Sequence, residues 1–229
     1  MHKITRISLS ALLSLCLSHS VYAEMTTELQ KQSYALGAGF GMQMKSQQIE
    51  VDIDKFIQAF RDAYHGNDLA FGEDELKAHS KAFQTRMMAQ ARVKAEAAGS
   101  ENKVAGEAFL AKNKTRDGVV TTDSGLQYEI LTAGEGAKPT AADKVKVHYT
   151  GTLIDGTVFD SSVERGEPIS FKLSNVIKGW TEGLQLMNVG AKYKFYIPSE
   201  IAYGERQQGQ TIGPNSTLIF EVELLGINE

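Results

Sequence analysis

Two different spacings of hydrophobic residues divide the chain. Up to about residue 114 the apolar side chains return every three or four positions, the period of a helix. After Asp117 and Gly118 they alternate with polar side chains, the period of strands with one buried face. The change predicts an α+β protein with a helical front half and a C-terminal antiparallel sheet.

The front half begins with two segments that predict short helices. The first carries Gly37 and Gly41 on or beside its apolar face. Glycine costs about 1 kcal/mol of helix propensity relative to alanine, which is tolerated chiefly where another backbone packs closely. The second segment has Asp52 or Asp54 as its cap. Two such helices are too small to form a core alone, so residues 24–72 are expected to form a module that pairs with a second copy of the chain.

A single long helix is predicted for residues 73–115. The stretch has no proline, and strong helix formers dominate it. A helix of about 40 residues would be about 60 Å long. Its apolar positions are sparse, so most of its middle is expected to face water as a connecting helix. Gly99 and Ser100 mark a soft point, where a break into two shorter helices is the alternative.

Residues 117–229 predict an antiparallel sheet of five or six strands curved over one short helix. The helix is indicated by Trp180, Leu184 and Met187 at helical spacing, between two of the strands. Asp155 and Gly156 predict a hairpin turn. The alternating segments are Leu126–Ile130, Val145–Tyr149, Ile169–Leu173, Tyr193–Ile197 and Leu218–Leu224.

The first 23 residues have the layout of a secretion signal. A basic start with Lys3 and Arg6 precedes an apolar run over residues 7–17, which is too short to span a bilayer. Small residues before Glu24 suit cleavage, so we expect an exported chain that begins there. The destination is expected to be the periplasm, with outer-membrane association or the cell surface left open.

The only cysteine, Cys16, lies in that apolar run, so a mature chain would have no disulfide and no reactive thiol. Lipidation of Cys16 is an alternative, but the bulky Leu15 before it is unfavourable. Cleavage would remove two of the 24 basic residues and leave all 28 acidic ones, a net charge of −6. Nucleic acid is therefore not expected as a partner. No later segment approaches 18 consecutive apolar residues, so no transmembrane segment is expected in the mature chain.

Metal, nucleotide and covalent chemistry find little support in the sequence. The histidines expected in the mature chain, His65, His79 and His148, have no second ligand at a motif spacing, so no metal is expected. The glycines of residues 37–41 lack the spacing and the preceding strand of a dinucleotide loop. An S-x-x-K match at Ser100 has neither companion motif. No cofactor is expected.

A set of aromatic and aliphatic residues in the sheet domain is the remaining candidate. Periodicity alone favours the simple interpretation that these side chains form the core. Two features favour a pocket instead. Asp160 follows Phe159 directly at the end of a strand, and the loop over residues 200–216 is longer than most connections.

Four segments make the C-terminal half similar to the FKBP immunophilins, which bind tacrolimus and rapamycin. They are VHYTGTLIDGTVFDSS at 147–162, VIKGWTEGLQLMNVG at 176–190, IAYGE at 201–205 and TLIFEVELL at 217–225. The likeness covers residues 117–229 in one consistent order. The front half resembles in layout the macrophage infectivity potentiator group, exported bacterial FKBPs with an N-terminal dimerisation module and a long connecting helix.

This resemblance implies a half-barrel sheet wrapped on a short helix, and peptidyl-prolyl cis/trans isomerase activity on proline-containing exported polypeptides. It also implies a homodimer through residues 24–72 and inhibition by macrolides of the tacrolimus and rapamycin class. The alternative is a dimeric, chaperone-like module that binds proline-containing or unfolded segments with little turnover.

The resemblance also assigns the site residue by residue. The implied catalytic residues are Asp160, Tyr203 and Tyr149, and the implied substrate-binding residues are Phe159, Phe171, Val176, Ile177, Trp180, Ile212 and Phe220, with Trp180 as the floor. The Tyr203 hydroxyl, with help from the Ile212 backbone, is expected to hold a substrate carbonyl. This sequence departs from the family pattern in the spacing around Ile169 and Phe171, and in having Gln207 and Gln208 where some members have histidine.

Overall fold

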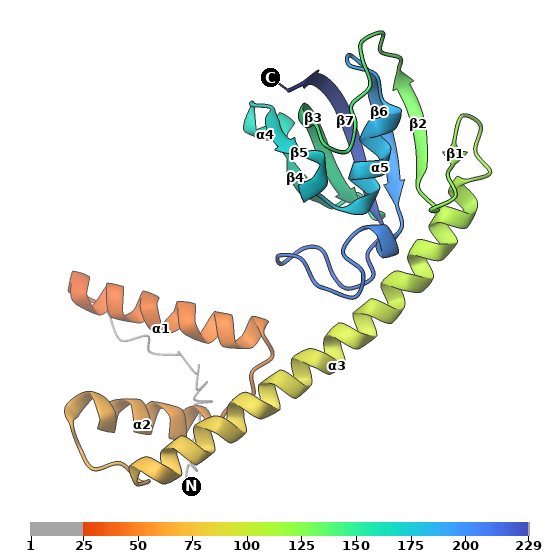
Figure 1. Cartoon of the computed structure of the whole chain (residues 1–229). Helices are drawn as coiled ribbons and strands as arrows, with labels where there is room; N and C mark the ends of the chain where they lie inside the picture. Colours follow the sequence, from red (N-terminus) through yellow and green to blue (C-terminus); the bar gives the residue numbers. More distant parts are fainter. Residues whose placement is uncertain (1–24, 229) are drawn as a thin grey trace, which may run out of the picture. The chain divides into compact units, whose positions relative to one another are not determined.

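The computed structural model describes residues 25–228. The chain divides into two compact units, one up to Glu73 and one from Asp74 onward (Figure 1). The expected signal segment over residues 1–23, with Cys16, lies outside the described residues. In the described part, no helix is both long and apolar enough to cross a bilayer.

The N-terminal unit contains the two short helices, α1 (Glu28–Ser46) and α2 (Ile53–His65). Thr27 begins α1 with a capping box, in which its side chain accepts a hydrogen bond from the Gln30 backbone and the Gln30 side chain accepts one in return. Asp52 caps α2. These caps satisfy the first N–H groups of each helix, which otherwise have no partner.

The apolar side chains of this unit remain largely exposed. Neither α1 nor α2 buries a described side chain. Leu36 is 78% exposed and Phe60 is 64% exposed. Phe40 and Phe56 stack at 5.7 Å between ring centroids, which joins the two helices but leaves Phe40 half exposed. The unit therefore presents apolar surface that it cannot cover by itself.

Helix α3 (Glu73–Asn113) is unbroken over 41 residues, so the predicted long helix is confirmed and Gly99 does not interrupt it. Most of its middle is exposed, as expected, but one narrow face is buried. Gly99, Gly106 and Asn113 are buried. They recur every seven residues and therefore share one helix face. This face packs against the sheet domain. Most of its contact residues are small or polar, so the sparse apolar pattern did not indicate the contact.

The sheet domain contains seven strands in the described chain, where the sequence predicted five or six. The spatial order is β1-β2-β6-β7-β3-β4, with β5 also paired to β3, and every pair is antiparallel. The strands are β1 (Val120–Thr121), β2 (Gln127–Thr132), β3 (Lys144–Leu153), β4 (Val158–Ser161), β5 (Ile169–Lys172), β6 (Lys192–Ile197) and β7 (Leu218–Ile227). The two-residue β1 is too short to produce an alternating pattern. The expected hairpin joins β3 and β4.

Short helical segments connect these strands. They are α4 (Ser162–Arg165), the 3₁₀ turn η1 (Leu173–Asn175), α5 (Lys178–Leu186) and the 3₁₀ turn η2 (Ser199–Ile201). Leu173, expected at the end of a strand, instead begins η1.

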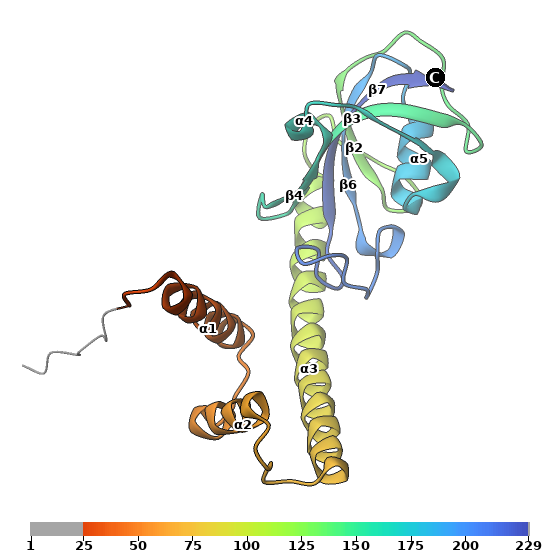
Figure 2. The same ribbon diagram turned by 90° about the vertical axis from the view of Figure 1, so that its left-hand side faces the viewer.

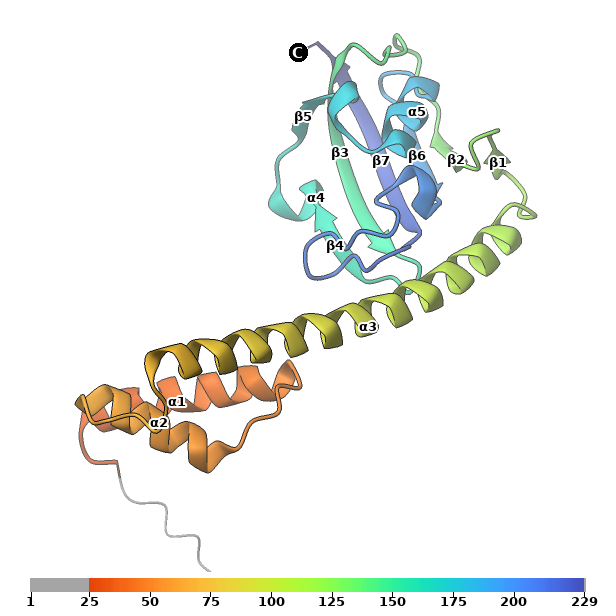
Figure 3. The same cartoon turned by 60° about the horizontal axis from the view of Figure 1, so that its bottom comes forward.

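Helix α5 lies against one face of the sheet and forms the core with it (Figures 2 and 3). Leu184 of α5 and Val147 of β3 are fully buried, and Phe195 of β6 is nearly so. The approach is close at Gly183, where an added Cβ would lie 2.7 Å from the Phe195 ring. This is the predicted sheet wrapped on a short helix.

The C-terminal part of α3 covers part of the opposite face of the sheet. Tyr196 is only 3% exposed, although strict alternation assigns it to the polar face. Its ring lies 5.9 Å from that of Phe109 on α3. Asn113 of α3 donates a hydrogen bond of 2.9 Å to the buried Gln127 side chain of β2. The sheet is therefore buried on both faces where α3 crosses it.

Replacing Leu184 with alanine is expected to lower the free energy of unfolding by about 2–5 kcal/mol, because it removes a fully buried side chain between α5 and the sheet. Urea denaturation measures this change. Leu131→Ala, at a side chain that is 44% exposed, is the control and should cost much less. Equal losses for the two variants would contradict the assigned core.

Candidate functional site

One hollow of about 1100 Å³, open to solvent, lies between β3, β4, β5, the start of α5 and a long loop after η2. We call that loop, residues 202–217, the pocket loop. The structure brings together around this hollow all ten residues assigned from the sequence: Tyr149, Phe159, Asp160, Phe171, Val176, Ile177, Trp180, Tyr203, Ile212 and Phe220. Neighbouring side chains do not fill it. The catalytic and binding roles of these residues stay predictions.

Trp180 is the centre of an aromatic cluster in the hollow. Its ring centroid lies 5.2 Å from that of Tyr149 and 5.0 Å from that of Phe220, both near perpendicular. Phe171 lies 5.3 Å away and is the ring beside Trp180, whereas Ile169 lines the hollow as a side chain that is 41% exposed. Both residues therefore line the hollow, and Phe171 is the one that contacts Trp180. The indole N–H of Trp180 is buried and has no hydrogen-bond partner among the described residues.

Gly151 of β3 allows two of these rings to approach the strand. An added Cβ would lie 2.5 Å from the Phe159 ring and 2.8 Å from the Phe220 ring. The two rings themselves meet edge to face, with centroids 5.3 Å apart. Any side chain at Gly151 would therefore displace the wall of the hollow.

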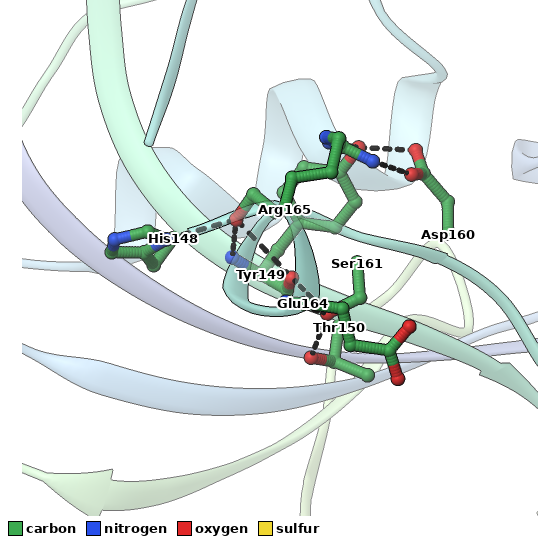
Figure 4. Close-up of polar contacts among 8 residues, drawn as sticks. His148, Tyr149, Thr150, Asp160, Ser161, Glu164 and Arg165 are labelled. Carbon is green, nitrogen blue, oxygen red and sulfur yellow. Dashed lines mark hydrogen bonds and ion pairs between the residues drawn. The ribbon is translucent and has the colours of Figure 1, made fainter. Parts of the chain in front are cut away.

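One edge of the hollow is polar (Figure 4). The Tyr149 hydroxyl donates a short hydrogen bond to the Asp160 carboxylate, which also forms an ion pair with Arg165. Arg165 donates a second hydrogen bond of 3.2 Å to the Tyr149 hydroxyl. Its guanidinium carbon lies 5.8 Å from the centroid of the Tyr149 ring. The three side chains thus hold one another in place.

Arg165 was missed by the sequence reasoning, although its local signal is present. Ser161 caps α4 by accepting a hydrogen bond from the Glu164 backbone at 3.2 Å, and Gly166 ends the helix in the left-handed region at φ 79°. A capped single turn directly after Asp160 brings the residue five positions later back beside the carboxylate. Sequence motifs that end at Ser162 do not include it.

The polar edge keeps Asp160 ionised. Burial alone would raise the pKa of the Asp160 carboxyl, but hydrogen bonds from Tyr149 and Arg165 and the Arg165 charge outweigh burial, and the pKa lies below its ordinary value. Burial is the main cause that raises the pKa of Tyr149, and the hydrogen bond to Asp160 adds to it. Near neutral pH the site therefore holds a carboxylate and a neutral phenol.

Besides the Trp180 indole N–H, the lining residues include further hydrogen-bond donors that are unused within residues 25–228. The Tyr203 hydroxyl has no partner there, and burial together with the nearby Asp160 charge raises its pKa, so it remains a donor. The backbone N–H of Ile177, just before α5, also lacks an acceptor. The Ile212 backbone was expected to help, but its N–H donates to the Gln208 carbonyl at 3.3 Å and its carbonyl accepts from Gln208 at 2.8 Å.

The two glutamines that depart from the family pattern both lie in the pocket loop. Gln208 lines the hollow and pairs with Ile212 through its backbone. Gln207 donates a side-chain hydrogen bond of 3.0 Å to the Gly209 carbonyl. Across residues 25–228, the structure has no group of three or more histidine, cysteine, aspartate or glutamate residues that could hold a metal ion.

Replacing Arg165 with glutamine is expected to raise the pKa of Asp160, because the carboxylate loses a charged hydrogen-bond donor. In the wild type the lowered pKa means that Asp160 stabilises the fold above its unfolded-state pKa near 3.8, and that this contribution is lost as the pH falls through the folded-state pKa. The variant should lose less stability on acidification. Carbon-detected NMR titration of the Asp160 carboxyl measures the shift.

Arg116→Gln is the matched control, since Arg116 pairs with Glu129 away from the hollow. It should leave the pKa of Asp160 unchanged. An unaltered Asp160 titration in Arg165→Gln would contradict the assigned polar edge.

Comparisons with known proteins identify the family of the chain. Residues 135–225 match the family model described as FKBP-type peptidyl-prolyl cis-trans isomerase, and residues 29–130 match the domain described as amino terminal to it. The outer membrane protein MIP of Legionella longbeachae is 42% identical over 224 residues, which cover 96% of each chain. The probable FKBP-type peptidyl-prolyl cis-trans isomerase FkpA of Neisseria meningitidis is 47% identical over 202 residues, 87% of this chain and 74% of its own.

A solved structure gives the same result. The crystal structure of FkpA from Escherichia coli aligns with a TM-score of 0.68 at 40% identity, covering 90% of this chain and 99% of that one. The two family matches together span both the helical front half and the sheet domain. The chain belongs to the FKBP-type peptidyl-prolyl cis-trans isomerase family.

Proposed function

We propose that the hollow binds a proline-containing segment of an exported polypeptide and accelerates rotation about its X-Pro bond. The observation that carries this proposal is an open apolar hollow over Trp180 with unused donors, the Tyr203 hydroxyl and the Ile177 N–H, among its lining residues. A prolyl ring suits such an aromatic surface, and the donors suit the carbonyls on either side of it.

The chemistry requires no nucleophile. X-Pro bonds isomerise over tens to hundreds of seconds because rotation must break amide conjugation, with a barrier of about 18–20 kcal/mol for peptide bonds in general. The planar imide is more charge-separated than the twisted transition state. Transfer from water to an apolar hollow therefore destabilises the planar state more, and the barrier falls.

The polar residues fix one side of the bond while the other side turns. Tyr203 donates to a substrate carbonyl, and the Ile177 N–H, which is free where the Ile212 N–H is engaged, holds a second one. Asp160 acts electrostatically on the turning carbonyl carbon. Tyr149 and Arg165 hold the Asp160 carboxylate in position and keep it ionised.

We expect macrolides of the tacrolimus and rapamycin class to inhibit the protein at the same hollow, because they offer a ring and carbonyls to the same surfaces. Export is supported by the basic and apolar layout of residues 1–23. The periplasm is the proposed destination, where folding assistance to proline-containing clients is the role. Association with the outer membrane is a further proposal that we draw from the similarity to the outer membrane protein MIP of Legionella longbeachae.

We also propose that residues 24–72 form the interface of a homodimer. The apolar faces of α1 and α2 are exposed in the single chain, with Phe60 at 64% and Ile57 at 47%. A second copy with the same faces is the simplest surface to cover them. Two hollows on one dimer would raise the effective concentration on a long client. That arrangement also supports the alternative of a chaperone-like module with little turnover.

Tyr203→Phe is expected to lower kcat/KM about five- to ten-fold, because it removes one hydrogen bond to the substrate. Asp160→Leu should lower it about ten- to hundred-fold, because it removes a charged group and leaves Arg165 unpaired. NMR exchange spectroscopy on a short X-Pro peptide, with and without rapamycin, measures both rates.

The control for these variants is Tyr34→Phe, a loss of the same hydroxyl on the exposed face of α1. It should retain the wild-type rate. Enhancement by the wild type that Tyr203→Phe and Asp160→Leu leave untouched would refute the assigned roles. Peptide binding without rate enhancement by the wild type would favour the chaperone-like alternative.

Phe60→Glu in the chain from residue 24 to 229 is expected to shift the protein from dimer to monomer, because it places a charge in the proposed interface. Sedimentation velocity measures the mass. Gln58→Glu adds the same charge to α2 at an exposed polar position and should leave the dimer intact. A wild-type chain that sediments as a monomer would refute the proposed dimer.

A further inference from the structure

Hydrogen bonds join helix α3 directly to the pocket loop. Asn102 of α3 donates a hydrogen bond of 2.9 Å to the Pro214 carbonyl and lies 3.4 Å from the Ser216 hydroxyl. Asn215 of the loop donates a bond of 3.2 Å to the Gly99 carbonyl of α3. In Figures 1 and 3 the loop lies beside the middle of α3.

Two glycines of α3 allow this contact to be close. A Cβ at Gly99 would lie 3.1 Å from the Pro214 side chain. A Cβ at Gly106 would lie 2.3 Å from the Thr217 hydroxyl oxygen, a separation at which something must move. The helix thus tolerates two poor helix formers on the face that meets the loop.

These bonds lie next to the residues of the loop that line the hollow. The Asn215 backbone N–H donates to the Gly204 carbonyl at 2.7 Å, and Gly204 directly follows Tyr203. Asn215 therefore ties both ends of the loop to α3 through one residue, which adopts a left-handed φ of 55°. Pro214, held by Asn102, is two positions from Ile212.

We propose that Asn102, Gly99 and Gly106 make α3 a positioning element of the isomerase site, which fixes the pocket loop and with it Tyr203 and Ile212. A loop of this length would otherwise sample many conformations, and a donor held before the substrate arrives binds it more tightly. The inference rests on the proposed function of the hollow. It gives α3 a role in substrate binding besides that of a connection.

Asn102→Ala in the chain from residue 24 to 229 tests the proposal. We expect kcat/KM for an X-Pro peptide to fall about three- to ten-fold, chiefly through a higher KM, because a loosened loop binds ground state and transition state equally less well. Glu101→Ala, the neighbouring exposed position on the same helix, is the control and should retain the wild-type KM. Thermal unfolding of each variant gives the folded fraction.

A compensating pair tests the close contact separately. Gly106→Ala alone should raise KM, because the new methyl group displaces Thr217. Adding Thr217→Ala removes the hydroxyl that the new methyl group meets, so the KM of the double variant should return most of the way to the reference. The reference is Thr217→Ala alone. Alanine also favours the helix, so a loss of activity in Gly106→Ala would not arise from a weaker helix.

The outcomes separate this inference from the proposed function. A wild type that does not accelerate X-Pro rotation would refute the proposed function of the hollow. An active wild type in which Asn102→Ala and Glu101→Ala have the same KM would refute only the positioning role. The positioning role would also be refuted if the rate of Asn102→Ala fell only in proportion to its folded fraction. It would be refuted as well if Thr217→Ala did not reverse the loss in Gly106→Ala.

Discussion

The site depends on how aromatic rings pack around Trp180. Tyr149 and Phe220 meet the indole at steep angles, and the Phe159 ring in turn meets Phe220 edge to face. Such rings stabilise one another without stacking flat. The strand opposite them must present almost no side chain, and Gly151 meets that requirement. An apolar surface large enough for a prolyl ring then stays open to solvent inside a well-packed domain.

The charged group at the edge of the hollow needs partners because the surrounding surface is apolar. Asp160 lies at the end of β4, and α4 returns Arg165 to it within five residues. A carboxylate beside aromatic rings would be unstable without these partners, since burial disfavours its charge. The site therefore keeps one fixed negative charge at its edge, while the Tyr203 hydroxyl and the Ile177 N–H remain uncommitted.

Most of the fold could be predicted because its signals are local. Period-two segments placed the main strands, and the spacing of Trp180, Leu184 and Met187 placed α5. The membership of the hollow came from motifs shared with a family rather than from periodicity, which favoured a filled core. Arg165 lay just beyond those motifs.

The contact between α3 and the sheet domain could not be predicted for a different reason. Apart from the Phe109 ring, it uses glycines, asparagines and backbone carbonyls, none of which adds to an apolar pattern. Alternation likewise assigns the buried Tyr196 to a polar face, because it describes one strand and carries no information about a helix that is distant in the sequence. Such long-range polar packing is visible only in three dimensions.

Trp180 is the only tryptophan in the 229 residues, and it lines the hollow. Indole emission from the whole chain therefore originates at one place, beside the position that a ligand would occupy. The wavelength and intensity of this emission depend on whether water or a ligand covers the ring. The protein consequently contains an intrinsic optical probe of occupancy, which can be read in unlabelled material and without turnover.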